Sequence, residues 1–139
     1  IRFVVRKITN GVAKIHLGLS DSITLGNIKI AKDWGYSPDF VEGMWLMLQQ
    51  ENPDDYILST NQSRTIEDLL NIAFNVISES DWIKYIKVDP KFIRPIEMDA
   101  IRGDYSKAKS VLGWEPKTNF EEMITKMVKN DINILKNKK

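Results

Sequence analysis

Several segments of the chain repeat apolar residues at the three- and four-residue spacing of a helix. The first predicted helix ends at Gly18, and its apolar stripe consists of Val4, Ile8, Val12 and Ile15. Another begins at Thr65, where Asp68 occupies the capping-box position, and repeats Ile66, Leu69, Leu70, Ala73, Phe74 and Ile77. The last begins at Asn119 with Glu122 in the equivalent position, and repeats Phe120, Met123, Ile124, Met127 and Val128.

Two further helices are predicted between these. Ser37 is expected to be the N-cap of a helix that carries Pro38 in its first turn and ends before Asn52. One apolar face of this helix consists of Val41, Met44, Trp45 and Leu48. A shorter helix is predicted for residues 106–112, ending at Gly113. Because tryptophan is highly buried on average, two tryptophans are expected in the core, Trp45 and Trp114.

Short segments with flanking turn residues predict strands at residues 23–25, 28–30, 56–59 and 83–88. These strands are scattered and are outnumbered by helices, so the pattern predicts a small α+β fold. With 139 residues, 42% of them apolar, the chain is long enough for one compact domain. We expect that domain to cover residues 1–135, followed by a basic tail at residues 136–139.

The charges of the chain nearly cancel, with 20 lysines and arginines against 19 aspartates and glutamates. No net field would therefore attract a nucleic acid or a membrane, and an anionic ligand must be held by a few local cations. The chain has no cysteine, which excludes disulfides, thiolate nucleophiles and cysteine-based zinc sites. No stretch approaches an apolar membrane span, and a cytoplasmic protein is expected. Because the chain opens with Ile1 and a helix follows almost at once, we expect it to be part of a longer protein.

Motifs that would carry chemistry by themselves are absent or weak. None of the seven glycines has the spacing of a phosphate-binding loop, so no self-sufficient dinucleotide site is predicted. Tyr105 and Lys109 match the Tyr-x-x-x-Lys pair of short-chain dehydrogenases, but without that loop we interpret them as a solvated helix start. His16 has no second ligand at metal spacing and is interpreted as a surface histidine. No catalytic residue or metal ligand is predicted.

A series of longer motifs is distributed along the chain from about Phe3 to about Asp131. They are Phe3-Val4-Val5-Arg6-Lys7-Ile8, Leu25-Gly26-Asn27, Lys32-Asp33-Trp34-Gly35, Asp39-Phe40-Val41-Glu42-Gly43-Met44-Trp45-Leu46-Met47-Leu48-Gln49, Arg94-Pro95-Ile96-Glu97, Gly103-Asp104-Tyr105-Ser106-Lys107-Ala108-Lys109 and Leu112-Gly113-Trp114-Glu115-Pro116. In this order and at this spacing, the chain resembles the GDP-mannose 4,6-dehydratase family of extended short-chain dehydrogenases/reductases.

The resemblance implies both a fold and a reaction. Members of the family join a Rossmann domain to a smaller carboxy-terminal domain, and convert GDP-mannose to GDP-4-keto-6-deoxymannose with NADP. The implied mechanism oxidises C4 by hydride transfer, eliminates water across C5 and C6, and returns the hydride to C6. This chain is then an α+β fragment of an α/β protein, the carboxy-terminal part that binds substrate, with the Rossmann half absent. Alone it is expected to be inactive and to bind no cofactor, whereas the full-length enzyme is expected to be a homo-oligomer.

By the same resemblance, four residues of this chain bind the GDP-sugar. Arg94 contacts the diphosphate. Arginine suits this role because its planar guanidinium can donate hydrogen bonds to two oxygens at once. Glu97 accepts hydrogen bonds from the ribose hydroxyls, and Lys7 lies near the nucleotide. Lys32 stands where the family usually has an arginine that contacts the phosphates.

Departures from the family pattern leave alternatives open. Lys32 lacks the bidentate fork of arginine, so its phosphate contact is expected to be weaker or altered. Arg2 and Val5 replace the usual asparagine and threonine, which is consistent with a related GDP-sugar dehydratase, epimerase or reductase. An alternative of another class is a non-catalytic module that binds a nucleotide or a partner protein through apolar surface that a Rossmann half would cover.

Overall fold

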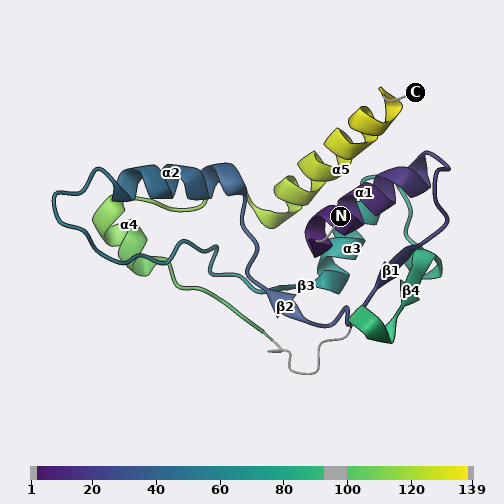
Figure 1. Cartoon of the computed structure of the whole chain (residues 1–139), viewed down its shortest axis with the longest axis horizontal. Helices are drawn as coiled ribbons and strands as arrows, with labels where there is room; N and C mark the ends of the chain where they lie inside the picture. The colour runs from purple at the N-terminus through teal and green to yellow at the C-terminus, as the bar shows by residue number, and fades with distance from the viewer. Residues whose placement is uncertain (1–2, 93–99, 138–139) are drawn as a thin grey trace. The chain divides into compact units, whose positions relative to one another are not determined.

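The computed structural model describes residues 3–92 and 100–137, which group into two compact units (Figure 1). Unit 1 comprises residues 1–30, 65–97 and 124–139, and unit 2 comprises residues 31–64 and 98–123. The elements in chain order are α1 (Val4–His16), β1 (Ile23–Leu25), β2 (Ala31–Lys32), α2 (Ser37–Met47), β3 (Arg64–Thr65), α3 (Ile66–Asn75), η1 (Trp82–Tyr85), β4 (Ile86–Val88), η2 (Pro90–Phe92), α4 (Ser106–Leu112) and α5 (Phe120–Lys136), where η marks a 3-10 helix.

The helices predicted from the sequence are all present in the described residues. The capping box of α3 is confirmed, because the Thr65 hydroxyl accepts from the Asp68 N–H at 3.0 Å and the Asp68 carboxylate accepts from the Thr65 N–H at 2.8 Å. At α5, the Asn119 side chain accepts from the Glu122 N–H at 2.8 Å. No helix in the described part of the chain has the length and apolar character needed to cross a membrane.

The core of unit 1 is built on α1, α3, β1 and the part of α5 that begins at Ile124. α1 packs against α3, and β1 pairs in parallel with β4, with Ile23 opposite Ile86 and Leu25 opposite Val88 (Figure 1). The buried apolar residues of this unit are Ile8, Val12, Ala13, Ile23, Leu25, Ile66, Leu69, Leu70, Ala73, Phe74, Trp82, Ile124 and Val128. Residues of the stripes predicted for α1, α3 and α5 therefore do contribute to this core.

The strand predicted for residues 28–30 is wrong, and the strand of this region is β2, which pairs with β3. The carbonyls of Ile28 and Ile30 instead accept from the backbone N–H groups of Glu67 and Ile66, at 3.1 and 3.2 Å. The first N–H groups of a helix have no partner within the helix itself. Residues 28–30 supply acceptors to the first turn of α3, and this use competes with strand pairing.

The strand predicted for residues 83–88 is confirmed only for its last three residues, which form β4. The first part belongs to the 3-10 helix η1. Trp82 at the start of η1 is buried, and its indole N–H donates to Asn71 Oδ1 at 2.6 Å. Burying this large ring with its polar group satisfied outweighs the local preference for an extended backbone.

A buried cluster of unit 2 is formed by α4 and by Trp114, which lies two residues after the end of this helix. Trp114 is 1% exposed, which confirms the prediction of its burial, and its indole N–H donates to the Asp39 carbonyl at 2.7 Å. Ala108 and Leu112 complete the buried cluster, and the side chains packed on it belong to Phe40, Leu46, Met47, Tyr56, Leu58 and Tyr105. The strand predicted for residues 56–59 is wrong, because these residues pack on this core without a neighbouring strand in the described chain.

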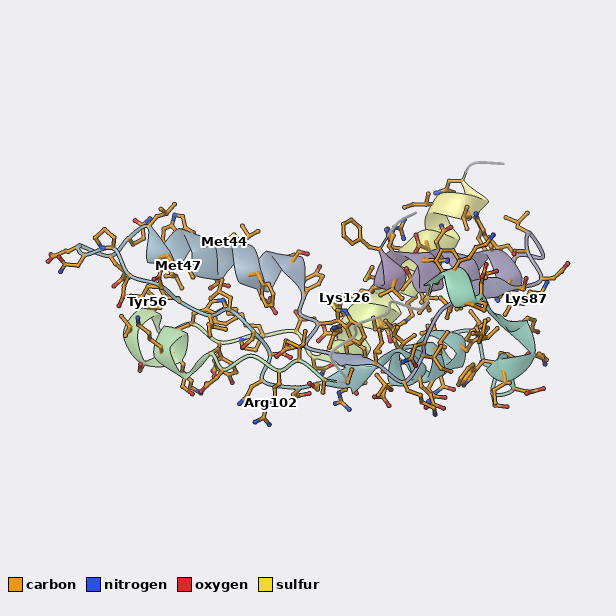
Figure 2. The ribbon with its side chains drawn as sticks, turned by 60° about the horizontal axis from the view of Figure 1, so that its bottom comes forward. Met44, Met47, Tyr56, Lys87, Arg102 and Lys126 are labelled. Carbon is orange, nitrogen blue, oxygen red and sulfur yellow. The ribbon has the colours of Figure 1, made fainter. Side chains whose placement is uncertain are left out.

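The apolar face predicted for α2 lies in solvent rather than in the core. Trp45 is 59% exposed, so the prediction of its burial is wrong, and the same face exposes Val41, Met44 and Leu48. The other side of the helix contacts the core, and Figure 2 shows Met44 and Met47 on different sides of α2, with Met47 toward Tyr56 and α4. The N-cap is Tyr36 instead of Ser37. α2 is thus apolar on two sides, and periodicity alone does not tell which side packs within this chain.

An ion pair joins α1 to α5 within unit 1. Arg6 donates a hydrogen bond to Oδ1 of Asp131, whose side chain is completely buried, whereas 39% of the Arg6 side chain is exposed. The second oxygen of Asp131 has no hydrogen-bond partner among the described residues. A buried carboxylate depends strongly on its cation, because an unpaired charge in a protein interior costs several kcal/mol.

In unit 2, Asp33 joins three segments through its carboxylate. Oδ1 accepts from the Thr60 N–H at 2.9 Å and from the Thr60 hydroxyl at 2.6 Å, and Oδ2 accepts from the Gly103 N–H at 3.2 Å. Asp33, which follows β2, is thereby tied to the segments that contain Thr60 and Gly103. Hydrogen bonds to a charged acceptor are stronger than neutral ones, so a single side chain orders this part of the unit.

We predict that Arg6→Ala lowers the free energy of unfolding by about 3 kcal/mol, because it leaves the buried Asp131 carboxylate without its cation. Urea unfolding followed by circular dichroism measures the loss. The matched control is Lys29→Ala, which removes the cation of an exposed pair with Glu67, 2.5 Å between Nζ and Oε2, and should cost less than about 1 kcal/mol. Equal losses for the two variants would contradict the structural role of Arg6.

We predict that Asp33→Ala destabilises the protein by about 2 kcal/mol, since it leaves donors of Thr60 and Gly103 without an acceptor. Asp33→Asn keeps one side-chain oxygen that can accept and should lose about half as much. Thermal unfolding of the three proteins checks this order. If the alanine and asparagine variants lose the same stability, the hydrogen bonds to Asp33 are not what holds these segments.

Candidate functional site

Lys7 lies on α1 and presents a cation that no described carboxylate neutralises. Its side chain is partly buried, and its ammonium lies 4.0 Å from the centroid of the Phe92 ring. An ammonium at this distance is attracted by the negative face of the ring but keeps its full charge. Unit 1 therefore holds a positively charged group at a defined place, and no carboxylate among the described residues cancels its charge.

The position of Phe92 follows from the backbone of β1 and β4. Beyond β4, the Asp89 N–H donates to the Leu25 carbonyl at 2.9 Å and so continues the parallel pairing. The Asp89 carboxylate accepts from the Lys91 N–H at 2.9 Å, and the Phe92 N–H donates to the Asp89 carbonyl at 3.0 Å. These bonds close η2 against the end of β1, and Phe92 is its last residue.

Gly26 allows the backbone of Phe92 to approach the end of β1. A Cβ at this position would lie 2.3 Å from the carbonyl oxygen of Phe92 and 2.7 Å from its carbonyl carbon. Both contacts are too short for any side chain, and both involve backbone atoms that cannot turn away. The glycine of the Leu-Gly-Asn motif thus has a steric reason.

Lys32 is the second residue of β2 in unit 2, and no described carboxylate pairs with it. Its neighbour Ala31 forms a parallel bridge with Ala100, and the Ala31 carbonyl accepts from the Ile101 N–H at 3.2 Å. On its other side Asp33 is held by the three hydrogen bonds described above. The backbone at Lys32 is therefore fixed beside the segment that starts at Ala100.

Arg94 and Glu97 lie outside the described residues, so their roles stay predictions, and the same holds for Arg2. Lys7 and Lys32 belong to different units, and the structure places each of them only within its own unit. Within those units, Lys7 contacts the residue before the segment 93–99, and the strand of Lys32 bridges to the residue after it.

A hollow of about 190 Å³ is present in unit 2, away from the predicted residues. Its lining residues are Trp34, Thr60, Gln62, Arg64, Tyr105, Pro116, Lys117, Thr118, Asn119 and Phe120. Both of its cations have carboxylate partners, because Arg64 lies 3.4 Å from Glu121 and Lys117 lies 2.6 Å from Glu42. This hollow therefore offers an anion no uncompensated charge.

The remaining candidates from the sequence have structural explanations. The Lys109 ammonium lies 2.5 Å from Glu115, and this hydrogen bond raises the pKa of Lys109 above its usual value. Tyr105 packs edge-on against Trp114 with 5.9 Å between ring centroids, so the Tyr-x-x-x-Lys spacing here serves packing and an ion pair. His16 is exposed, as interpreted from the sequence. In the part of the chain that the structure describes, no group of histidine and acidic residues could hold a metal ion.

Three residues that fix these positions were missed by sequence reasoning. Gly26 and Asp33 both lie in motifs that carry the family resemblance, but nothing in the sequence around them predicts which residues they contact. Phe92 stands two residues before Arg94 in an irregular connection, where periodicity says nothing about its partner. Only the pairing of β1 with β4 shows that Phe92 meets Lys7.

Comparison with known proteins agrees with the resemblance seen in the motifs. Residues 1–127 match the family model described as GDP-mannose 4,6 dehydratase. GDP-mannose 4,6 dehydratase 1 of Arabidopsis thaliana is 44% identical over 137 residues, which cover 99% of this chain and 38% of that protein. The GDP-mannose 4,6 dehydratase of Homo sapiens is 35% identical over 150 residues, covering 96% of this chain and 40% of that protein. The chain thus spans about two fifths of the length of these relatives.

Solved structures show the same fold in larger proteins. The structure of RMD from Pseudomonas aeruginosa complexed with NADPH matches with a TM-score of 0.83 at 18% identity, covering 95% of this chain and 43% of that one. UDP-glucose 4-epimerase from Thermotoga maritima with UDP-glucose matches with a TM-score of 0.74 at 23% identity, covering 92% and 40%. The expected α+β part of a larger dehydrogenase/epimerase fold is confirmed. Since the family model covers nearly the whole sequence, this chain belongs to the GDP-mannose 4,6-dehydratase family.

Proposed function

We propose that this chain forms the GDP-sugar-binding part of a GDP-mannose 4,6-dehydratase, and that a cofactor half outside this chain binds NADP. Family membership supports the reaction, and the relatives are much longer than the chain. The observation that carries the binding role is the Lys7 ammonium, held at 4.0 Å from the Phe92 ring with no described carboxylate to neutralise it. A fixed cation with its charge intact is what a diphosphate requires.

The diphosphate of a GDP-sugar is best met by several fixed cations that also donate hydrogen bonds. Lys7 offers a compact charge, whereas Arg94 offers a planar fork that suits two phosphate oxygens. Arg94 follows Phe92 by two residues, so covalent geometry alone keeps their Cα atoms within about 7 Å. Because the Phe92 ring contacts Lys7, the two cations are proposed to serve the same phosphates.

The other two predicted residues complete the proposed contacts. Lys32 is proposed to add a cation for the phosphates, and its backbone is held between the Ala31 bridge and Asp33. Lysine donates from a single centre, so its contact is expected to be less directional than that of the family's usual arginine. Glu97 is proposed to accept from the ribose hydroxyls, because an ionised carboxylate has two oxygens and only accepts.

The redox and elimination steps are proposed to take place on the cofactor half. RMD was solved with NADPH, which supports a nicotinamide cofactor for this fold. The reaction needs a hydride carrier and acid–base groups, and none of the seven glycines of this chain has the spacing of a phosphate-binding loop. The role proposed for this chain is therefore to bind and orient the nucleotide-sugar, which contributes to catalysis by positioning.

The exposed face of α2 supports the presence of such a half. Val41, Met44, Trp45 and Leu48 are between 55% and 82% exposed and share one side of the helix. A contiguous apolar stripe of this size on a folded protein marks a contact surface. We propose that the cofactor half covers it, whereas the rival interpretation is a module that binds an unrelated partner protein through the same stripe.

We predict that the complete dehydratase binds GDP at least about tenfold more tightly than UDP, because polar groups that pair with guanine are left unpaired by uracil. Isothermal titration calorimetry with each nucleotide measures the difference. Equal affinity for GDP and UDP would contradict a GDP-sugar substrate. Binding of neither nucleotide would favour the partner-binding module.

We predict that Arg94→Ala weakens GDP-mannose binding to the complete enzyme by about 1.5 to 3 kcal/mol, the scale of hydrogen bonds to a charged group. The dissociation constant measured by calorimetry checks this value. Lys91→Ala is the matched control. Lys91 is exposed and lies three residues before Arg94, and its substitution removes the same charge. If the two variants bind equally well, charge alone matters and Arg94 does not contact the diphosphate.

A further inference from the structure

Two adjacent cations of α1 have partners of different kinds. Arg6 is paired with the buried carboxylate of Asp131, so its charge is neutralised within unit 1. The next residue, Lys7, has the face of the Phe92 ring as its partner, 4.0 Å from the ammonium to the ring centroid. A carboxylate fixes a cation and cancels its charge, whereas an aromatic ring fixes it and leaves the charge intact.

We infer that Phe92 is a positioning residue for Lys7, which it holds ready for the phosphates of the nucleotide-sugar. This inference rests on the proposed function and extends it to a residue that does not itself contact the ligand. A free lysine side chain samples many rotamers and loses that freedom when it binds an anion. The ring restricts the ammonium beforehand, so less entropy is lost on binding.

The exposure of Phe92 supports this role over a packing role. The side chain is 53% exposed, so it is held at the surface and not in the core. Its backbone is nevertheless tightly placed by the hydrogen bonds of Asp89 and by the close approach that Gly26 permits. A ring that is rigidly mounted but half in solvent gains little from burial, and its defined contact is the Lys7 ammonium.

An ordinary packing contact makes a different prediction from a cation–π contact. If the carbon stem of Lys7 merely covers an apolar surface, leucine at position 92 would serve as well as phenylalanine. If the ring face attracts the ammonium, tyrosine or tryptophan replaces phenylalanine and leucine does not. The series Phe92→Tyr, Phe92→Trp and Phe92→Leu therefore separates the two, and the exposure of the position makes all three compatible with the fold.

The test measures GDP affinity of the complete enzyme by calorimetry at low ionic strength. Phe92→Leu should weaken GDP binding about two- to fivefold, the range of a cation–π contact at an exposed site. Phe92→Tyr and Phe92→Trp should bind like the parent protein. In a Lys7→Met background, Phe92→Leu should have no further effect, because two residues that act through one contact are not additive.

The matched control is Phe3→Leu, which makes the same substitution at an 82% exposed phenylalanine beside α1 and should leave GDP affinity unchanged. The Lys7 side-chain proton resonances give a second readout, since the ring current of Phe92 should shift them upfield in the parent and not in Phe92→Leu. Weakening by Phe92→Leu that persists in Lys7→Met, or unchanged affinity in Phe92→Leu, would overturn the inference. Unchanged affinity in Lys7→Met would remove both residues from the site, while Arg94→Ala tests the proposed function independently.

Discussion

The parallel pairing of β1 with β4 is the contact on which the candidate site of unit 1 depends. It joins segments separated by residues 26–85, and its register sets Leu25 opposite Val88 and brings Asp89 to the Leu25 carbonyl. Slipping the register by one residue would turn every side chain of β4 to the other face. The turn that ends in Phe92 would then no longer meet Lys7. The backbone hydrogen bonds between β1 and β4 thus determine whether Lys7 can contact Phe92.

The cations of unit 1 show how neighbouring residues of one helix serve different purposes. Arg6 stabilises the unit because it pairs with the Asp131 carboxylate, which is buried away from solvent. Lys7 contributes less to stability, because a cation–π contact at an exposed site is weak. The weaker contact is the one that leaves charge for a ligand. Stability and the proposed anion binding would therefore fall on adjacent side chains, Arg6 and Lys7.

The helices were predictable because their signals are local. The Thr65–Asp68 capping box and the apolar stripe of α1 each lie within a few residues, and the structure confirms both. The strands were less predictable, since a strand of two or three residues exists only where a partner lies alongside it. Residues 28–30 look like a strand but supply acceptors to α3 instead. Of the candidate site, Lys7 and Lys32 were predicted from the family resemblance, and their binding role stays a prediction. The contact of Phe92 with Lys7 was missed because it depends on a non-local backbone pairing.

The sequence of α2 holds information that the fold of this chain alone does not use. Periodicity correctly found an apolar face with Trp45, but the opposite face, with Met47, is the one that packs on Trp114. A helix that is apolar on both sides is suited to lie between two layers. The core of unit 2 covers one side of α2, whereas the side with Met44 and Trp45 is exposed. The error over Trp45 is therefore one of context, because periodicity finds both apolar sides of the helix but does not tell which of them packs within the described residues.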